Sequence, residues 1–298
     1  MNKKLLSASF IGTIFGAFFC AVFVCLPDGF PADTLTVNVQ SRNPQSGTAV
    51  PEVQHWNPQE TAVIICDMWD KHWCAGATAR VAEMAPAMND VLAAARKSGI
   101  TIIHAPSETL HFYADHPGRK KLAQYAEKPL VQVSTARLDT EKSAKFPVSA
   151  KNGGCDCDNY CAYLDVYMRE HGGKFPWQRE IAALTADDND LISDSGSEIG
   201  SYLQEHKFKN VIVMGVHTNM CVIGRSFGLR AMKRLGLNAV LMRDMTDTMY
   251  NHRGEPFVPH FEGTALVVKY IEQYVCPSML STDFTGKKPF LFKGAGEN

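Results

Sequence analysis

Residues 211–247 read VIVMGVHTNMCVIGRSFGLRAMKRLGLNAVLMRDMTD, and this stretch decides the fold class. It opens with an apolar run that ends at Gly215, passes through a polar turn and a predicted helix that stops at Gly236, and returns to an apolar run at 238–242. Apolar strand, helix and apolar strand form a βαβ unit, which requires a parallel sheet. Strands that are buried on both faces read as continuous apolar runs, as these do.

The same alternation recurs along the chain. The predicted strands cover 61–66, 100–104, 190–193, 210–215 and 238–242, and the predicted helices cover 78–98, 198–206, 219–235 and 258–274. We therefore predict a three-layer α/β/α domain over residues 61–276, with a mostly parallel, Rossmann-like sheet of five to six strands.

Three other regions do not follow this alternation. Residues 33–60 are rich in Thr, Asn, Gln, Ser and Pro, which predicts a linker or loose arm. Residues 106–188 are irregular and rich in Pro, Gly, Lys and Cys, which predicts a lid insertion over the strand ends, with a short helix at 163–170. Residues 277–298 are polar and Gly-rich, which predicts a surface tail.

The N-terminus has the order of a secretory signal. A short basic start at Met1–Lys4 precedes an uncharged apolar run at 5–26 and a small-residue exit near Ala32. The run is also long enough to stay as a membrane anchor. We expect residues 1–32 to export the chain to the periplasm or the exterior, with the membrane contacted only through an uncleaved leader.

Charge and composition indicate the class of partner. The chain carries 30 Lys and Arg against 31 Asp and Glu, a formal net charge of -1. Such a chain has no overall basic field for nucleic acid. A small-molecule substrate is the better expectation, with no nucleic-acid partner.

Three of the nine cysteines cluster in GGCDCDNYC, namely Cys155, Cys157 and Cys161. One interpretation is a local disulfide, with the third thiol paired to Cys74 or Cys276. The other is a metal knuckle, although the second ligand pair of a usual zinc site is missing. Export favours the disulfide interpretation. A redox or cross-linking role for this segment is a further hypothesis.

The chemistry is expected at the carboxyl ends of the strands, where open α/β sheets bind ligands. Asp67, His104 and Cys221 follow three of the predicted strands. A thiol in the first turn of a helix feels the positive end of the helix dipole, which lowers its pKa, and free amides of that turn can hold an oxyanion. The alternative is a structural cysteine on the inner helix face.

Two motifs carry a resemblance to a known family. The segment GVHTNMCV at 215–222 resembles the nucleophile turn of the isochorismatase-like cysteine hydrolases, which include nicotinamidases, and AVIICDMWD at 62–70 resembles their opening strand with its Asp. The resemblance implies an enzyme that cleaves a small amide or related bond. Relatives of this fold often self-associate, so a homo-oligomer is also an expectation.

The resemblance implies roles for particular residues. Cys221 would be the nucleophile and Asp67 the proton carrier. A non-proline cis peptide would lie near Val216 and His217, and the amides of His217 and Cys221 would form the oxyanion hole. We expect Trp69, Trp73 and Asn219 to line the substrate pocket.

One departure concerns the third residue of the family, a lysine at the end of the strand before the nucleophile strand. Here that strand runs into Asp194, and no lysine lies between Lys174 and Lys207. Three explanations stay open, and they are a substitute lysine, a substitute histidine, or a small-molecule-binding pseudoenzyme without turnover. The substitutes considered are Lys71, Lys145 and Lys151 among the lysines, and His104, His72 and His217 among the histidines.

Nicotinamidases of this family carry zinc on an Asp and two His after the second strand. The equivalent stretch, 104–118, contains His104, Glu108, His111, Asp115 and His116 but lacks the Asp-x-His pattern. We therefore expect no cofactor, with zinc at this position as the alternative.

Overall fold

The computed structural model describes residues 34–296 apart from 150, 158–160 and 162–163. The predicted leader, residues 1–32, lies outside the described residues. Within the described ranges, no helix has both the length and the apolar character that a membrane crossing needs.

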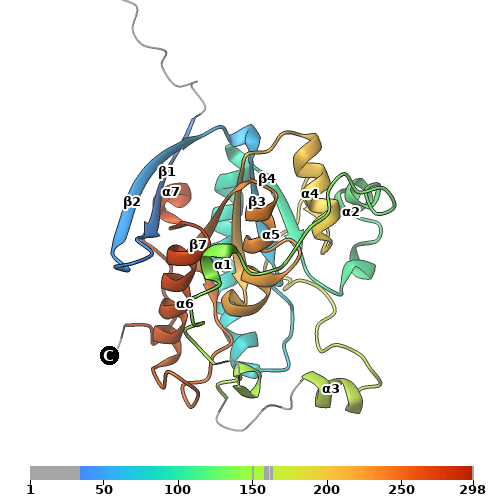
Figure 1. The fold of residues 1–298 in the computed structure, drawn as a ribbon. Helices are drawn as coiled ribbons and strands as arrows, with labels where there is room; N and C mark the ends of the chain where they lie inside the picture. The colour runs from blue at the N-terminus through green and yellow to red at the C-terminus, as the bar shows by residue number, and fades with distance from the viewer. Residues whose placement is uncertain (1–33, 150, 158–160, 162–163, 297–298) are drawn as a thin grey trace, which may run out of the picture. The chain divides into compact units, whose positions relative to one another are not determined.

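A single mixed sheet of eight strands forms the centre of the fold (Figure 1). The strands are β1 (Leu35–Arg42), β2 (Ala49–Trp56), β3 (Thr61–Cys66), β4 (Thr101–Ala105), β5 (Leu191–Ile192), β6 (Asn210–Val216), β7 (Asn238–Asp247) and β8 (Ser278–Met279). Their order is β2-β1-β8-β7-β6-β3-β4-β5. All neighbours from β8 to β5 are parallel, and β1 is antiparallel to both β8 and β2. The mostly parallel α/β/α class is confirmed, but five to six strands was too few because the β1–β2 hairpin was missed.

Helices cover both faces of the sheet. They are α1 (Ala75–Lys97), α2 (Pro117–Ala123), α3 (Leu164–Glu170), α4 (Gly196–Glu205), α5 (Leu229–Arg234), α6 (His260–Tyr274) and α7 (Thr282–Thr285). One core lies between the sheet and α4, α5 and α6, and the other between the sheet and α1. Along β3, Ile64 belongs to the first core and Ile65 to the second, so both faces of the strand are buried. This double burial explains the continuous apolar run in the sequence.

The segment 33–60, expected to be a linker, is instead a hairpin on the sheet edge, drawn in blue in Figure 1. Val37 and Val39 are buried, while most side chains of β2 are exposed. An edge hairpin that buries only alternate residues of one strand has a polar composition, which conceals the strand pattern. The predicted surface tail is also partly wrong, because 277–298 contributes β8 and the buried Phe292 to the fold.

The segment 106–188, expected to be one lid, divides into two parts. The early part covers the sheet flank, where Leu122 of α2 shares a core with Ile199 and Leu203 of α4. The later part reaches the carboxyl end of β3, where the Ile181 amide donates to the Met68 carbonyl oxygen at 2.7 Å. The start of the early part also lies at the predicted site, because the Ser107 amide donates to Asp67 at 2.8 Å.

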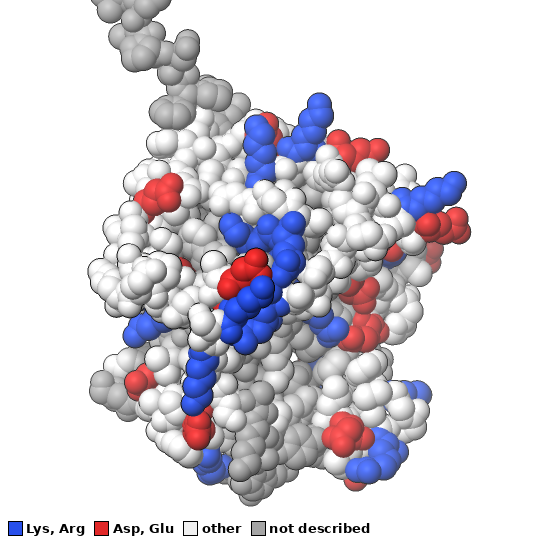
Figure 2. Space-filling model, in the orientation of Figure 1, with Lys and Arg blue, Asp and Glu red and all other residues white. Residues whose placement is uncertain are grey.

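Charged side chains of both signs are interspersed on the face drawn in Figure 2, with one small basic group near its centre. This pattern matches the near-zero net charge of the whole chain.

Candidate active site

The carboxyl ends of β3 and β6 lie side by side and bring Asp67 close to the nucleophile turn. The strands are parallel neighbours, and Cys66 is paired with Gly215. Gly215 has a φ of +108°, and a Cβ atom there would lie 2.1 Å from the Cys66 carbonyl oxygen. The position therefore requires glycine, since any side chain would push the two strands apart.

The nucleophile turn after β6 is wider than an α-helical turn. The Val216–His217 peptide is cis, where the resemblance implies a non-proline cis bond. The Val222 amide reaches back to the His217 carbonyl oxygen at 3.2 Å, and the Arg225 amide donates to the Cys221 carbonyl oxygen at 2.9 Å. The predicted helix 219–235 is thus interrupted, and α5 begins only at Leu229.

Asp67 is fully buried and has three polar partners. Its Oδ1 accepts a hydrogen bond from the Ser107 amide at 2.8 Å, and its Oδ2 lies 3.3 Å from Nε of Arg225. The Cys221 thiol donates to the same carboxylate. Burial raises the pKa of Asp67 above its ordinary value, while Arg225 and the thiol oppose that rise.

Cys221 is partly exposed, and the pKa of its thiol is raised. Burial is the largest cause, the negative charge of Asp67 adds to it, and Arg225 opposes both. The expected lowering by a helix dipole is therefore wrong for the resting site. The wide turn replaces a regular helix start, and the nearby carboxylate disfavours a second negative charge.

Arg225 is the site residue that the sequence interpretation missed. It lies four residues after Cys221, hydrogen-bonds to the thiol, and pairs with both Asp67 and Glu108. Its Nη atoms are 3.1 and 3.4 Å from the Glu108 carboxylate oxygens. Its signal in the sequence is the i,i+4 spacing after the cysteine, which places the two side chains on one side of a helical turn.

The proposed lysine substitutes lie elsewhere. Lys71 is exposed, with Nζ 6.0 Å from the centre of the Tyr167 ring, and the exposed Lys145 pairs with Glu255 at 3.6 Å. The side chain of Lys151 is outside the description. Neither described lysine is therefore a partner of the thiol.

His104, the other substitute considered, belongs to a separate buried network. Its Nδ1 lies 2.7 Å from Glu180 and its Nε2 3.3 Å from Asp190. Burial opposes a charge on the ring, but the two carboxylates raise the pKa of His104 to about 9. Both ring nitrogens are engaged there, so His104 is not the base of a Cys–His pair.

Two further histidines lie beside the nucleophile turn. His72 and His217 meet edge to face, with ring centres 5.0 Å apart. Burial lowers the pKa of His72 to about 4 and that of His217 well below its ordinary value. Both rings are thus neutral at pH 7, and neither replaces the positive charge of a lysine.

A cavity of about 440 Å³ opens next to the nucleophile turn. It is lined by His72, Trp73, Gly153, Leu164, Asp165, Met168, Met220 and Met249. Of the three predicted pocket residues, Trp73 alone is in this lining. Trp69 is buried and stacks on Trp177 with ring centres 4.0 Å apart. Asn219 is held by two hydrogen bonds to the Met249 backbone, at 2.9 and 3.0 Å.

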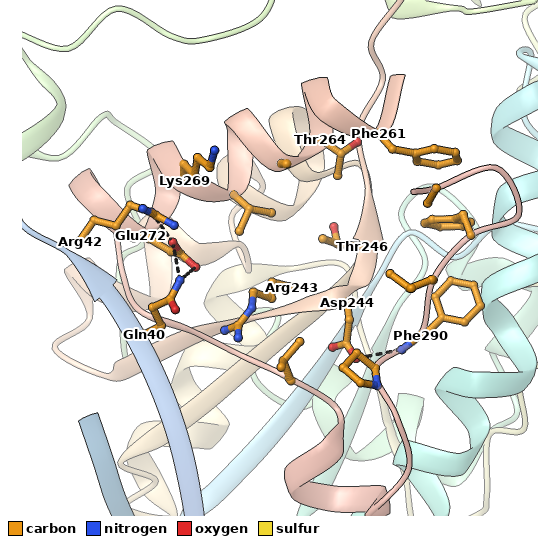
Figure 3. Close-up of a pocket in the computed structure, with 17 residues that line it drawn as sticks. Gln40, Arg42, Arg243, Asp244, Thr246, Phe261, Thr264, Lys269, Glu272 and Phe290 are labelled. Atoms are coloured by element: carbon orange, nitrogen blue, oxygen red, sulfur yellow. Dashed lines mark hydrogen bonds and ion pairs between the residues drawn. The ribbon is translucent and has the colours of Figure 1, made fainter. Parts of the chain in front are cut away.

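A second cavity of about 370 Å³ lies between β1, β7, α6 and the C-terminal segment (Figure 3). Arg243, Asp244 and Thr246 line it on one side, and Phe261 and Phe290 on another. Cys221, Asp67 and Arg225 are in the lining of neither cavity, but Met220 of the nucleophile turn lines the first one and no residue of 217–222 lines the second. The second cavity is therefore separate from the nucleophile turn.

The residues at 104–118 do not form the zinc set of the nicotinamidases. His104 is engaged as described, Nδ1 of His116 accepts the Gly118 amide at 3.1 Å, and Asp115 lies 3.2 Å from Lys120. Across the described residues, the only group of three or more ligand-type side chains close enough for a metal is formed by Cys74, Cys155, Cys157 and Cys161. These thiols are free in the described part of the chain, so the expected disulfide is not formed there.

No family model and no curated protein matches this chain. Among solved structures, a cysteine hydrolase from Pseudomonas syringae pv. phaseolicola 1448A is 17% identical, with 83% of this chain and 95% of that chain covered and a TM-score of 0.49. An isochorismatase family protein from Desulfovibrio vulgaris is 12% identical over 75% and 95%, with a TM-score of 0.43. A zinc-bound pyrazinamidase from Pyrococcus horikoshii is 14% identical over 74% and 99%, with a TM-score of 0.41. The second of these proteins carries the name of the family that the two motifs resemble, and the first is named as a cysteine hydrolase.

Proposed function

We propose that the chain is a cysteine hydrolase that cleaves a small amide or a related acyl bond. One observation carries the proposal. The Cys221 thiol, the Asp67 carboxylate and the Arg225 guanidinium contact one another at the carboxyl edge of the parallel sheet. A thiol that donates to a buried carboxylate beside a fixed cation is the arrangement of an activated nucleophile.

The reaction follows from these contacts. As the sulfur of Cys221 attacks the carbonyl carbon, its proton moves to Asp67 and a C–S bond forms. Asp67 then protonates the departing nitrogen as the C–N bond breaks, which leaves a thioester on Cys221. A water molecule gives its proton to Asp67 and attacks the thioester carbon; the C–S bond then breaks, the acid leaves, and Asp67 returns the proton to the sulfur of Cys221.

The raised pKa values of both groups suit this sequence. A thiol that keeps its proton until the substrate arrives stays a neutral partner of Asp67, and a carboxylate with a raised pKa is the stronger base. Arg225 keeps its charge and balances the negative charge that passes between Asp67 and the sulfur. The amides of His217 and Cys221 are the proposed donors to the oxyanion.

The cavity beside the turn indicates the substrate class. Trp73, Met220 and Met249 contribute apolar surface, His72 contributes a neutral ring, and Asp165 contributes one carboxylate. Such a lining disfavours an anionic substrate and favours a small carboxamide with an aromatic or branched apolar group.

A binding protein without turnover is the second candidate. The raised pKa of Cys221 favours it, because little thiolate exists before a substrate arrives. The two candidates differ in whether an acyl group is transferred to sulfur.

The test is a screen of small carboxamides and aryl esters with the full chain and with Cys221→Ser, Asp67→Asn and Cys276→Ser. The last variant is a matched control, because Cys276 is a buried cysteine of the core. We expect turnover, and an acyl adduct on the peptide that contains Cys221, only in the unaltered chain and in the Cys276→Ser control. Cys221→Ser and Asp67→Asn should show neither. Amides that raise the melting temperature without any turnover or adduct would establish the binding protein instead.

Export is a separate part of the proposal and depends on residues 1–32. Cell fractionation with identification of the mature N-terminus tests it. We expect the chain outside the cytoplasm and a new N-terminus near residue 33, whereas intact cytoplasmic chain would contradict export.

A further inference from the structure

Four cysteines from distant parts of the sequence meet at the start of α1. Cys74 precedes the helix directly, while Cys155, Cys157 and Cys161 come from the segment predicted to be a lid. Their sulfur atoms all lie within 4.8 Å of one another, and those of Cys74 and Cys157 are 3.7 Å apart. Four sulfurs placed tetrahedrally at about 2.3 Å from a zinc ion are about 3.8 Å apart, whereas a disulfide needs about 2.05 Å. The observed spacing fits the metal geometry.

Backbone amides of the first turn of α1 point at these sulfurs. The Ala75 amide donates to Cys161 at 3.5 Å and the Gly76 amide to Cys157 at 3.3 Å. The Ala77 amide hydrogen-bonds to Cys74. Amides at the start of a helix of 23 residues stabilise negative charge, and amide donors to sulfur are typical partners of metal-bound thiolates. The sulfurs are therefore placed where thiolates are favoured.

The close approach of the four sulfur atoms favours a cation between them. All four lie within 4.8 Å of one another, so thiolates at these positions would repel one another. A positive ion at the centre of the cluster would remove that repulsion.

The surroundings of the cluster are largely apolar, although Cys157 and Cys161 are only half-buried. Cys74 and Cys155 are buried, and Ala77, Met249 and Trp73 pack around the cluster. Oδ1 of Asp156 lies 3.7 Å from the Cys74 sulfur, while Oδ2 of the same carboxylate is held by Arg80 at 2.8 Å. The four sulfur atoms are thus the candidate ligands for a metal ion.

We propose that Cys74, Cys155, Cys157 and Cys161 bind one zinc ion as a structural tetrahedral site. Zinc is the redox-inert, borderline-soft ion that four thiolates hold in this geometry. Binding forms four Zn–S bonds, and every thiol that still carries a proton releases it to solvent, with no change of oxidation state. The site is separate from residues 104–118 and does not depend on the proposed hydrolase activity.

The position of the cluster indicates a structural role for the ion. Cys74 follows Trp73, and Cys155 follows Gly153 by two residues, and both Trp73 and Gly153 line the 440 Å³ cavity. The ion would join the two chain segments that form this wall. Its loss would loosen the cavity while Cys221, Asp67 and Arg225 keep their own contacts.

The first experiment measures the metal content of the full chain by inductively coupled plasma mass spectrometry. We expect about one zinc per chain in the unaltered protein and in the control Cys276→Ala, and none in Cys157→Ala. Cys161→His should keep its zinc, because a histidine nitrogen replaces the thiolate as a zinc ligand. Metal-free protein with these cysteines paired in disulfides, or zinc unaffected by Cys157→Ala, would overturn the proposal. Iron in place of zinc would overturn the choice of ion.

The second experiment uses the unaltered chain, so its result does not depend on whether the cysteine variants fold. The unaltered chain is stripped of metal by a chelator and titrated with Co²⁺, which reports thiolate ligation by an intense near-ultraviolet charge-transfer absorption. We expect saturation at about one Co²⁺ per chain and displacement by Zn²⁺. A titration without that absorption would overturn the proposal.

Discussion

The guanidinium of Arg225 lies with Nε 3.3 Å from Oδ2 of Asp67, in contact with the same carboxylate to which the Cys221 thiol hydrogen-bonds. The family lysine comes from the strand before the nucleophile strand, whereas this cation comes from the segment after it. The position of the missing lysine is taken by Asp194, which accepts the Glu108 amide at 2.9 Å and so helps to place a partner of Arg225.

Replacement of Arg225 by Met should slow the acyl transfer proposed here by about ten- to a thousand-fold, because a neighbouring cation favours a thiolate by about 1–3 pKa units. Arg225→Lys should retain part of the rate, since it keeps the positive charge but loses the planar guanidinium that binds through several nitrogens. Steady-state kcat/KM on a substrate from the amide screen measures this. Arg234→Met, at an exposed arginine, serves as the control, and a loss of the same size there would refute a specific role.

Replacement of Asp67 by Asn should abolish turnover and yet stabilise the fold near pH 7. Burial raises the pKa of Asp67, so its contribution to stability is present below the ordinary value of about 3.9 and is lost as pH rises through the folded value. The charged form therefore costs stability at neutral pH. We expect a Tm increase of about 2–4 °C for each kcal/mol regained, which shrinks toward acid pH. A Tm decrease at pH 7 would contradict this electrostatic assignment.

The His104 network should make stability depend on alkaline pH. The pKa of His104 is about 9 in the fold against about 6.5 for a free side chain. Its stabilisation is complete below about pH 6.5 and is lost as pH rises through about 9, with an upper bound of about 3 kcal/mol. Thermal unfolding from pH 6 to 10 should show this slope in the unaltered chain and in His206→Gln, and lose it in His104→Gln. A slope that survives His104→Gln would rule the network out as its source.

Gly215→Ala should destabilise the domain by about 1–3 kcal/mol, because the left-handed φ and the contact with the Cys66 carbonyl oxygen both oppose a Cβ atom. Urea unfolding measures the change. Gly236→Ala is a useful comparison, since it shares a positive φ of +83° but has no atom within 4 Å of the added Cβ. Equal losses at the two positions would show that the close approach of β3 and β6 contributes nothing.

The sequence predicted those parts of the fold in which burial is complete. β3 and β6 are buried at every position, and their apolar runs read directly as parallel strands. β1 and β2 were missed because they form an edge hairpin in which only Val37 and Val39 of β1 and Trp56 of β2 are buried. The composition of such a hairpin is polar and resembles that of a loop.

The candidate site shows the same division. Asp67 and Cys221 follow buried strands and were found, as was the position of the cis peptide. Arg225 had a signal in the sequence, its four-residue spacing from Cys221, which was not used. The approach of Cys74 to the cluster around Cys157 depends on how a loop returns to the start of α1, and motif spacing contains no information on that return.

The most direct test of the charge-coupled site is the alkylation rate of Cys221 against pH, followed by mass spectrometry of the peptide that contains it. Three proteins are compared, namely the unaltered chain, Asp67→Asn and Arg225→Met. We predict an apparent pKa above the free-cysteine value of about 8.5 in the unaltered chain, a lower one in Asp67→Asn, and a higher one in Arg225→Met. Identical profiles in all three proteins would contradict the coupling of Cys221, Asp67 and Arg225.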